Sequence, residues 1–227
     1  MREIVLDTET TGLDPLTGHR VVEIGCVELV NHLPTGNHFW KYCDPERDMP
    51  EEAFRVHGLS REFLTGKPKF AEIAEEFLEF IGEAKLVIHN ASFDIGFLNA
   101  ELARLKRPPI PFDRAIDTVT LARERFPGAQ VNLDALCRRF QVDNSGRELH
   151  GALLDSQLLA EVYLELIGGR QPDLELAEDA AGETQTAGET AERKARPPRP
   201  HAPLPEERAA HAEMLEKIAD PIWNAGA

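Results

Sequence analysis

The first 169 residues alternate between apolar runs and clusters of turn residues. Runs rich in Val, Ile, Phe and Trp predict three strands in a meander of hairpins, at residues 2–7, 20–30 and 37–43, with turns at 15–18 and 34–37. A further short strand is expected at 86–89. Apolar side chains at helical spacing predict helices over 70–81, 94–106, 116–126, 133–140 and 152–167. Strands followed by strand–helix alternation indicate an α/β fold, with a mixed sheet flanked by helices.

The pattern changes after Gly169. Residues 177–202 contain no Val, Ile, Leu, Met or aromatic residue, so they bury too little apolar area to offset ordering entropy and are predicted to form a disordered linker. Apolar residues return in 203–227, where Ala210, Met214 and Ile218 predict a short one-sided helix. An isolated helix of this length is marginal in water, which favours a partner-binding peptide over a segment that folds back. We therefore expect a domain at 1–169 and a flexible C-terminal tail.

Composition narrows the class of protein. No apolar run reaches about 18 residues, and Asp7 and Glu9 interrupt the N-terminal run, so neither a transmembrane helix nor a signal peptide is expected. Three cysteines at scattered spacing favour reduced thiols in a cytosol over a disulfide framework or a zinc site. The net charge of -15 disfavours broad contact with a phosphate backbone. A nucleic-acid function would therefore require divalent cations, or a partner that holds the substrate.

Asp7 and Glu9 end the first predicted strand. Residues i and i+2 of a strand point to one face, so the two carboxylates stand side by side and repel each other. Either a proton or a bound cation would relieve that repulsion. The alternative is a solvated strand end before the turn at Thr11-Gly12.

Asp94 and Asp155 lie on the apolar stripes of two predicted helices. For Asp94 the alternative role is a helix cap. Asp155 lies in line with Leu158, Leu159 and Val162, where an unpartnered carboxylate costs several kcal/mol to bury, and no Lys or Arg lies between Arg147 and Arg170 to pair with it. Four acidic groups from one strand and two helices could share Mg²⁺ or Mn²⁺. Two such ions about 4 Å apart can activate a water and stabilise the leaving oxygen of a phosphodiester.

His150 is the candidate general base. It precedes Asp155 by five residues, and Gly151 after it suits a loop before the helix. A lone histidine is more often structural, but its closeness to Asp155 favours catalysis, because an imidazole near pKa 6.5 can take a proton from water at neutral pH.

Three segments together resemble the exonuclease motifs of the DEDDh superfamily: DTETTGLD at 7–14, VIHNASFDIGFL at 87–98 and LHGALLDSQLLAEVY at 149–163. NLDALCRRF and DNSGRELHGALLD are similar to its replicative proofreading members. The resemblance covers residues 1–169 and implies a ribonuclease-H-like fold with a five-stranded mixed sheet, and 3′→5′ exonuclease activity. Gly151 stands where tyrosine-type relatives carry their tyrosine, so the His class is indicated.

The resemblance also implies roles for single residues. The metal-binding carboxylates, for two Mg²⁺ or Mn²⁺ ions, would be Asp7, Glu9, Asp94 and Asp155, with His150 as general base. Substrate binding would use Asp7, Glu9 and Asp155 together with Thr10, Gly12, Glu52, His57, Asn90 and Phe93. Core packing for Phe93 and a capped turn for His57 are the alternatives.

The tail resembles its counterpart in the same proteins. Gln171, Leu174 and Leu176 have the spacing of a sliding-clamp peptide within 170–176, and 203–227 looks like a polymerase-binding segment. The leading hypothesis is a bacterial, cytoplasmic proofreading exonuclease, associated with the nucleoid and replisome, that removes mispaired nucleotides from a DNA 3′ end as 5′-mononucleotides. A small accessory subunit could bind the domain. The alternatives are an RNA 3′-end trimmer of the same superfamily and a mainly structural polymerase subunit.

Overall fold

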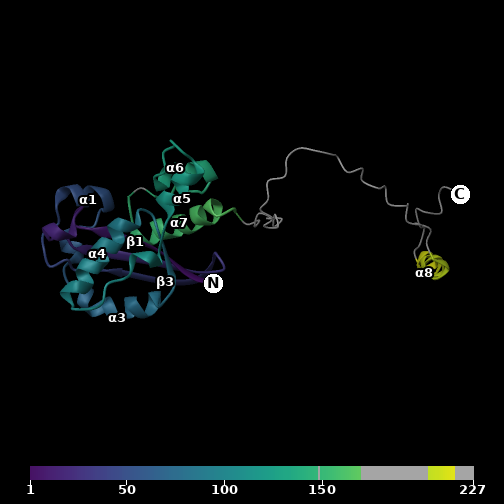
Figure 1. Cartoon of the computed structure of the whole chain (residues 1–227), viewed down its shortest axis with the longest axis horizontal. Coiled ribbons are helices and arrows are strands. Elements are labelled where there is room, and N and C mark those ends of the chain that lie inside the picture. The colour runs from purple at the N-terminus through teal and green to yellow at the C-terminus, as the bar shows by residue number, and fades with distance from the viewer. Residues whose placement is uncertain (148, 170–203, 218–227) are drawn as a thin grey trace, which may run out of the picture. The chain divides into compact units, whose positions relative to one another are not determined.

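Strand β1 (Arg2–Thr10) forms the centre of a five-stranded sheet in the computed structural model of the chain (Figure 1). The structure describes residues 1–147, 149–169 and 204–217. The other strands are β2 (Val21–Val30), β3 (Leu33–Tyr42), β4 (Lys85–Ile88) and β5 (Ala115–Asp117), in the spatial order β3-β2-β1-β4-β5. The pairs β1–β2 and β2–β3 are antiparallel, and the pairs β1–β4 and β4–β5 are parallel. The predicted mixed sheet is confirmed.

Helices cover both faces of the sheet, and Figure 1 shows α3 on one side of the strands and α6 and α7 on the other. Even-numbered residues of β1, such as Ile4 and Leu6, pack in one apolar core with α3 (Phe70–Ile81) and α4 (Ala91–Arg104). Odd-numbered Val5 packs in the second core with α5 (Thr118–Arg125), α6 (Leu133–Phe140) and α7 (Ala152–Leu166). The alternation of a strand therefore decides which helices each β1 side chain meets.

The hairpin between β2 and β3 differs from its prediction. The turn lies at Asn31 and His32, which have left-handed φ values of 51° and 66°, and not at residues 34–37. Two positive φ values in a two-residue loop match the twist of a hairpin, and Asn adopts them at low cost. Pro34 lies inside β3, where a proline is tolerated because β3 is an edge strand.

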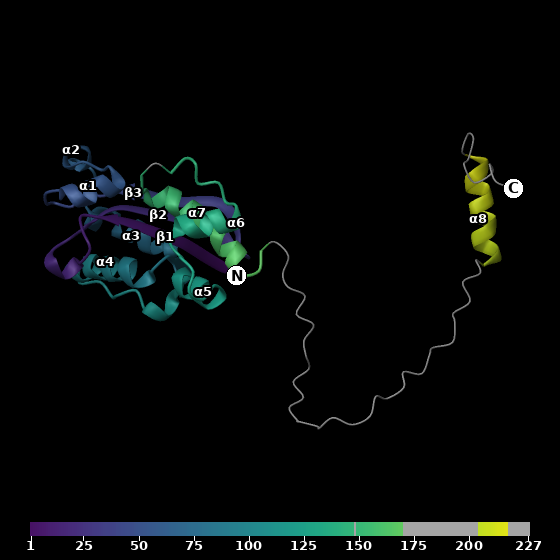
Figure 2. The same ribbon diagram turned by 90° about the horizontal axis from the view of Figure 1, so that it is seen from above.

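Two short helices were not predicted from the sequence. They are α1 (Glu51–His57) and α2 (Arg61–Leu64), and Figure 2 shows them together at the end of the sheet that lies away from the N-terminus. Their apolar side chains Phe54, Val56 and Phe63 are exposed, so the sequence carries no clear helical stripe there. Residues 116 and 117 were predicted as the start of a helix but lie in β5, and Asp117 caps α5 by accepting a hydrogen bond from Val119 N–H at 3.0 Å. Within residues 1–147 and 149–169 there are also two single-turn 3₁₀ helices, at Pro15–Thr17 and Phe112–Arg114.

The chain divides into two units, Met1–Glu175 and Leu176–Ala227. In the second unit the structure describes α8 (Pro205–Glu216), which buries none of its side chains. Within the described part of the chain no helix is long and apolar enough to cross a membrane. The three cysteines are buried and free. The clamp-peptide residues 171, 174 and 176, the linker 177–202 and Ile218 lie outside the described residues.

Gly25 on β2 allows the first turn of α7 to lie directly on the sheet. A Cβ atom on Gly25 would stand 2.2 Å from the carbonyl carbon of Ala152 and 2.3 Å from the amide nitrogen of Leu153. Ser156 Oγ donates a hydrogen bond to the Gly25 carbonyl at 2.9 Å. Because these contacts involve backbone atoms, no side-chain movement can make room.

Gly25→Ala is therefore expected to displace the start of α7 and to lower the free energy of unfolding by about 1–3 kcal/mol, the usual cost of overpacking. The matched control is Gly96→Ala on α4, where nothing lies within 4 Å of the added Cβ atom. Thermal unfolding of both variants tests this, and an unchanged melting temperature for Gly25→Ala would contradict the close approach.

Candidate metal centre and nucleotide pocket

Asp7 and Glu9 lie on the face of β1 that α7 covers. In the β1–β2 register, Asp7 stands opposite Gly25 and Glu9 opposite Glu23. The close approach at Gly25 brings the first turn of α7 over this face, and with it Asp155, which is only 3% exposed. Strand alternation, a glycine and a helix start thus bring three carboxylates together.

Asp94 approaches from the other face of the sheet. Strands β1 and β4 run parallel, but their pairing ends at Leu6 and Ile88, so β1 continues beyond β4. Helix α4 begins just after β4, and Thr8 Oγ1 donates a hydrogen bond of 2.7 Å to Asp94 Oδ1. Asp94 is 3% exposed, and Asn90 occupies the N-cap position, so a capping role for Asp94 is wrong.

Glu23 is a buried carboxylate beside the site that the sequence argument missed. Its Oε2 accepts a hydrogen bond from Ala152 N–H at 3.2 Å, and its Oε1 accepts one from Trp40 Nε1–H at 2.6 Å. Glu23 therefore caps the first turn of α7, the turn that carries Asp155, and favourably places a negative charge at a helix N-terminus. The signal was available, since one acidic residue and one glycine interrupt the apolar run VVEIGCV.

The carboxylates raise one another's pKa values. Burial, followed by the charges of Asp94, Glu9 and Asp155, raises the pKa of Asp7 well above its ordinary value. Burial, followed by the charge of Asp155, raises the pKa of Glu9 from 4.5 to about 8. Burial likewise raises the pKa of Asp94 to about 7, although the hydrogen bond from Thr8 opposes the shift. Such crowding of negative charge favours a bound cation.

Asp155 is the exception, because Arg147 neutralises it. Arg147 Nε and Nη2 donate to Asp155 Oδ1 and Oδ2 at 2.5 and 2.6 Å. Burial alone would raise the pKa of Asp155, but the hydrogen bonds and the charge of Arg147 outweigh it and hold that pKa below its usual range. The prediction that Asp155 lacks a local cation is therefore wrong, since Arg147 lies eight positions earlier in the preceding loop and pairs with it.

His150 lies at the mouth of this cluster. Its side chain is 48% exposed, and its Nδ1 lies 3.2 Å from Asp155 Oδ2. One ligand atom from each of Glu9, His150 and Asp155 can be chosen so that all three lie within 4.8 Å of one another. The donor set fits a divalent cation, because oxygen ligands dominate and the carboxylates repel one another without one.

A cavity of about 500 Å³ adjoins the carboxylates. Six of the predicted substrate-binding residues line it: Glu9, Thr10, Gly12, Glu52, His57 and Phe93. Asn90 does not line it. That residue has a left-handed φ of 70° and turns the chain from β4 into α4. Its backbone N–H donates a hydrogen bond to Asp117 Oδ1 at 3.1 Å.

Two histidines shape the cavity. His57 is 5% exposed, and its Nδ1 accepts a hydrogen bond from Leu59 N–H at 3.0 Å. Burial lowers the pKa of His57, so the neutral ring carries its proton on Nε2, which has no hydrogen-bond partner within the described residues. His19, which the sequence argument missed, packs so closely on Gly12 that a Cβ atom there would lie 2.3 Å from the ring.

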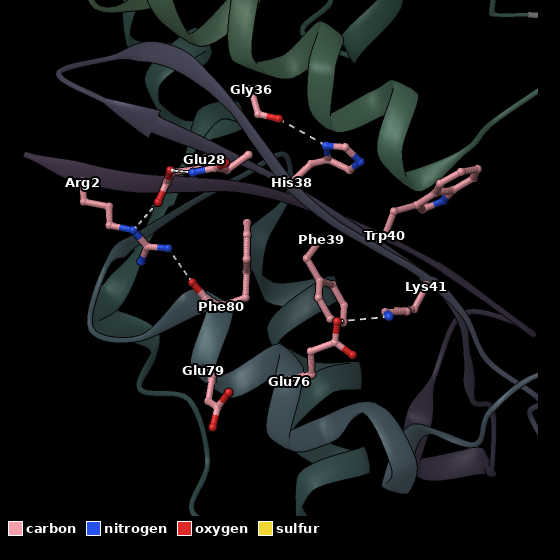
Figure 3. Close-up of a pocket in the computed structure, with 11 residues that line it drawn as sticks. Arg2, Glu28, Gly36, His38, Phe39, Trp40, Lys41, Glu76, Glu79 and Phe80 are labelled. Atoms are coloured by element: carbon pink, nitrogen blue, oxygen red, sulfur yellow. Dashed lines mark hydrogen bonds and ion pairs between the residues drawn. The ribbon is translucent and has the colours of Figure 1, made fainter.

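A second hollow, of about 800 Å³, lies between β3 and α3, away from the carboxylates (Figure 3). Two of its cations are already paired, with Arg2 Nε at 2.6 Å from Glu28 Oε1 and Lys41 Nζ at 3.0 Å from Glu76 Oε1. Its chemistry therefore does not suit a phosphate, and the smaller cavity beside Glu9 is the candidate nucleotide pocket.

The raised pKa of Glu9 predicts how the stability of the metal-free protein depends on pH. Because that pKa is higher in the folded chain than in the unfolded chain, folding takes up a proton between about pH 4.5 and pH 8, and stability falls as pH rises through this window. Glu9→Gln, which mimics the protonated side chain, should raise the melting temperature in chelator, and this gain should grow between pH 5 and pH 8. Glu83→Gln, at an exposed position, is the control. A gain for Glu9→Gln that does not change with pH would contradict the prediction.

A model of a known protein family matches most of the chain. The RNase_T family model, described as "Exonuclease", matches residues 4–163. The chain is 54% identical over 222 residues to DNA polymerase III subunit epsilon of Rickettsia felis. The matched region covers 96% of this chain and 97% of the relative. It is 52% identical over 192 residues to DNA polymerase III subunit epsilon of Escherichia coli K12, which covers 81% of this chain and 77% of the relative.

Solved exonuclease structures share the fold. Exonuclease X in complex with 5′ overhanging duplex DNA matches with a TM-score of 0.57 at 25% identity, over 73% of this chain and 90% of that chain. The nuclease domain of 3′hExo, a DEDDh family member bound to rAMP, matches with a TM-score of 0.64 at 20% identity, over 73% of this chain and 91% of that chain. The second likeness shows the fold alone.

Proposed function

The chain belongs to the exonuclease family whose model matches residues 4–163, and we propose that it is the proofreading 3′→5′ exonuclease of a bacterial DNA polymerase III, its epsilon subunit. The observation that carries this proposal is the cluster of buried carboxylates next to a cavity lined by Glu9, in a chain similar to epsilon subunits over nearly its whole length. The reaction removes a mispaired 3′-terminal nucleotide from DNA as a 5′-mononucleotide.

The acidic residues hold the metal. Asp7, Glu9, Asp94 and Asp155 would bind two divalent cations, Mg²⁺ or Mn²⁺. Bound there, such ions would lower the pKa of a water and offset the negative charge that develops on the phosphodiester oxygens. His150, half exposed beside Asp155, takes the proton from the attacking water. Thr8 fixes Asp94 by its hydrogen bond, and Glu23 fixes the helix turn that carries Asp155.

The cavity of about 500 Å³ receives the terminal nucleotide. The proposed substrate-binding residues are Asp7, Glu9, Thr10, Gly12, Glu52, His57, Asn90, Phe93 and Asp155. His57 offers its Nε2–H as a donor, and Phe93 offers a ring on which a base can stack. An end that is already frayed enters at lower cost than a paired end, because unstacking costs a few kcal/mol. Selectivity for mismatches then needs no reading of sequence.

Partners hold the DNA that the acidic domain does not. With a net charge of -15, the chain gains little from phosphate contacts of its own. We assign the segment 203–227 to the alpha subunit of DNA polymerase III and residues 171–176 to the sliding clamp. A small accessory subunit would bind the exonuclease domain. The complex works in the bacterial cytoplasm, at the nucleoid-associated replisome.

The chemistry is tested with a DNA primer that carries a 3′ mismatch, in Mg²⁺ and in chelator, beside a matched primer and an RNA control. We expect metal-dependent release of 5′-mononucleotides that is faster from the mismatched end. His150→Ala should slow this release by about 10²–10⁴-fold, and Asp155→Asn should abolish it. Equal rates on matched and mismatched ends would contradict the proofreading role, and preference for RNA would favour 3′-end trimming.

Removal of residues 170–227 should separate catalysis from assembly. The truncated protein retains the sheet, its helices and every proposed catalytic residue, so its rate on the mismatched primer should equal that of the full chain. Its binding to the polymerase subunit, measured by co-elution in gel filtration, should be lost. Co-elution of the truncated protein would show that the domain itself makes the polymerase contact.

A further inference from the structure

Arg147 makes more polar contacts with the site than any role assigned so far explains. Its side chain is only 7% exposed. Beyond the two bonds to Asp155, Nη1 donates to Asp134 Oδ1 at 2.7 Å, and Nη2 lies 2.7 Å from His150 Nδ1. From the loop before α7, one guanidinium therefore contacts α6 through Asp134, α7 through Asp155, and the proposed general base His150.

These contacts use the groups that the reaction needs. Both carboxylate oxygens of Asp155 accept hydrogen bonds from Arg147, so its side chain occupies one lone pair on each of the oxygens that would bind a cation. A guanidinium carries donors only, so His150 Nδ1 must accept, and the neutral ring then carries its proton on Nε2. In this arrangement His150 has no free lone pair with which to take a proton from water.

We propose that Arg147 is a positioning residue that stands in for the divalent cation: its guanidinium holds Asp155 and His150 in the metal-free protein and releases both when the cation binds. The inference rests on the proposed function, because it concerns the same metal site. Arg147 prevents the repulsion and desolvation that an unpaired Asp155 would suffer beside Asp7 and Glu9. The same ion pair competes with a cation for the two Asp155 oxygens, so Arg147 lowers the affinity for metal.

Asp134 remains an ion-pair partner for the guanidinium of Arg147 after it leaves Asp155. It lies on α6, its side chain is 44% exposed, and Asn144 Nδ2 also donates to its Oδ1 at 3.1 Å. Arg147 can therefore keep its bond to Asp134 while it leaves Asp155, and the exchange needs a change of side-chain rotamer rather than a rearrangement of the fold. His150 recovers the Nδ1 lone pair in the same exchange.

The first test is direct binding of Mn²⁺ to the full chain, followed by the electron paramagnetic resonance signal of the free ion. Arg147→Gln should bind Mn²⁺ at least about tenfold more tightly than wild type, which corresponds to about 1.4 kcal/mol. The control is Arg125→Gln, because Arg125 also stabilises α7, through hydrogen bonds to the carbonyls of Glu165 and Leu166, at its far end. A merely structural residue would leave the affinity unchanged or weaken it, so equal or weaker binding by Arg147→Gln overturns the proposal.

The second test requires no variant to fold with full stability. In metal-free wild type the Nε–H of Arg147 should give a protected ¹⁵N–¹H signal, assigned by its absence in Arg147→Lys, and saturating Mg²⁺ should remove or strongly shift it. The Nε–H of Arg20, bonded to Glu101 Oε1 at 2.6 Å, is the internal control and should not change. A signal of the Arg147 Nε–H that is the same with and without Mg²⁺ overturns the proposal, because it would show that the guanidinium stays bonded when the cation binds. This test therefore detects release itself, and not only an effect of the positive charge of Arg147 on metal affinity.

The two tests distinguish this inference from the proposed function. If wild type binds Mn²⁺ and degrades the mismatched primer while Arg147→Gln binds no more tightly, only the role of Arg147 is wrong. If wild type neither binds Mn²⁺ nor degrades the primer, the proposed function fails, and the role of Arg147 fails with it.

Discussion

Mutual repulsion among buried carboxylates at the C-terminal end of β1 is the constraint on which the rest of the structure depends. Asp7, Glu9 and Asp94 have raised pKa values because burial and neighbouring charge oppose ionisation. A folded chain tolerates such a cluster only if cations, protons or hydrogen-bond donors are fixed around it. Arg147 meets this requirement for Asp155, and Thr8 meets part of it for Asp94. The raised pKa values of Asp7 and Glu9 favour a bound cation beside these two carboxylates.

The sheet topology explains how residues so far apart in sequence meet at one point. Parallel β1 and β4 both run toward the same edge, and β1 extends past its partner, which leaves room for α4 to present Asp94. Antiparallel β2 returns along the other side of β1, and its Gly25 allows α7 to touch the sheet. The site therefore lies where two faces of one sheet become accessible together, and small changes in the position of α7 act directly on Asp155.

The sequence predicted what depends on local periodicity. Alternation along β1 placed Asp7 and Glu9 on one face, and the apolar stripe of α7 placed Asp155 against the core. It missed what depends on contacts between distant elements: Glu23 reaches α7 from β2, and Arg147 pairs across the loop before α7. Helices α1 and α2 escaped prediction because their exposed apolar residues follow no stripe, although α1 supplies Glu52 and His57 to the cavity.

The position of Arg147 also bears on when DNA can enter. Arg147 is not among the residues that line the nucleotide cavity. Its charge is paired with Asp155 and Asp134 and does not face an incoming phosphate. Without metal, the cavity is bordered by Glu9 and Glu52 in a chain of net charge -15, and a phosphate backbone meets repulsion there. Cations bound at the proposed metal site would thus also supply the positive charge that a phosphodiester needs to enter. Metal loading and substrate entry would then be coupled by electrostatics, because no Lys or Arg lines the cavity among the residues that the structure describes.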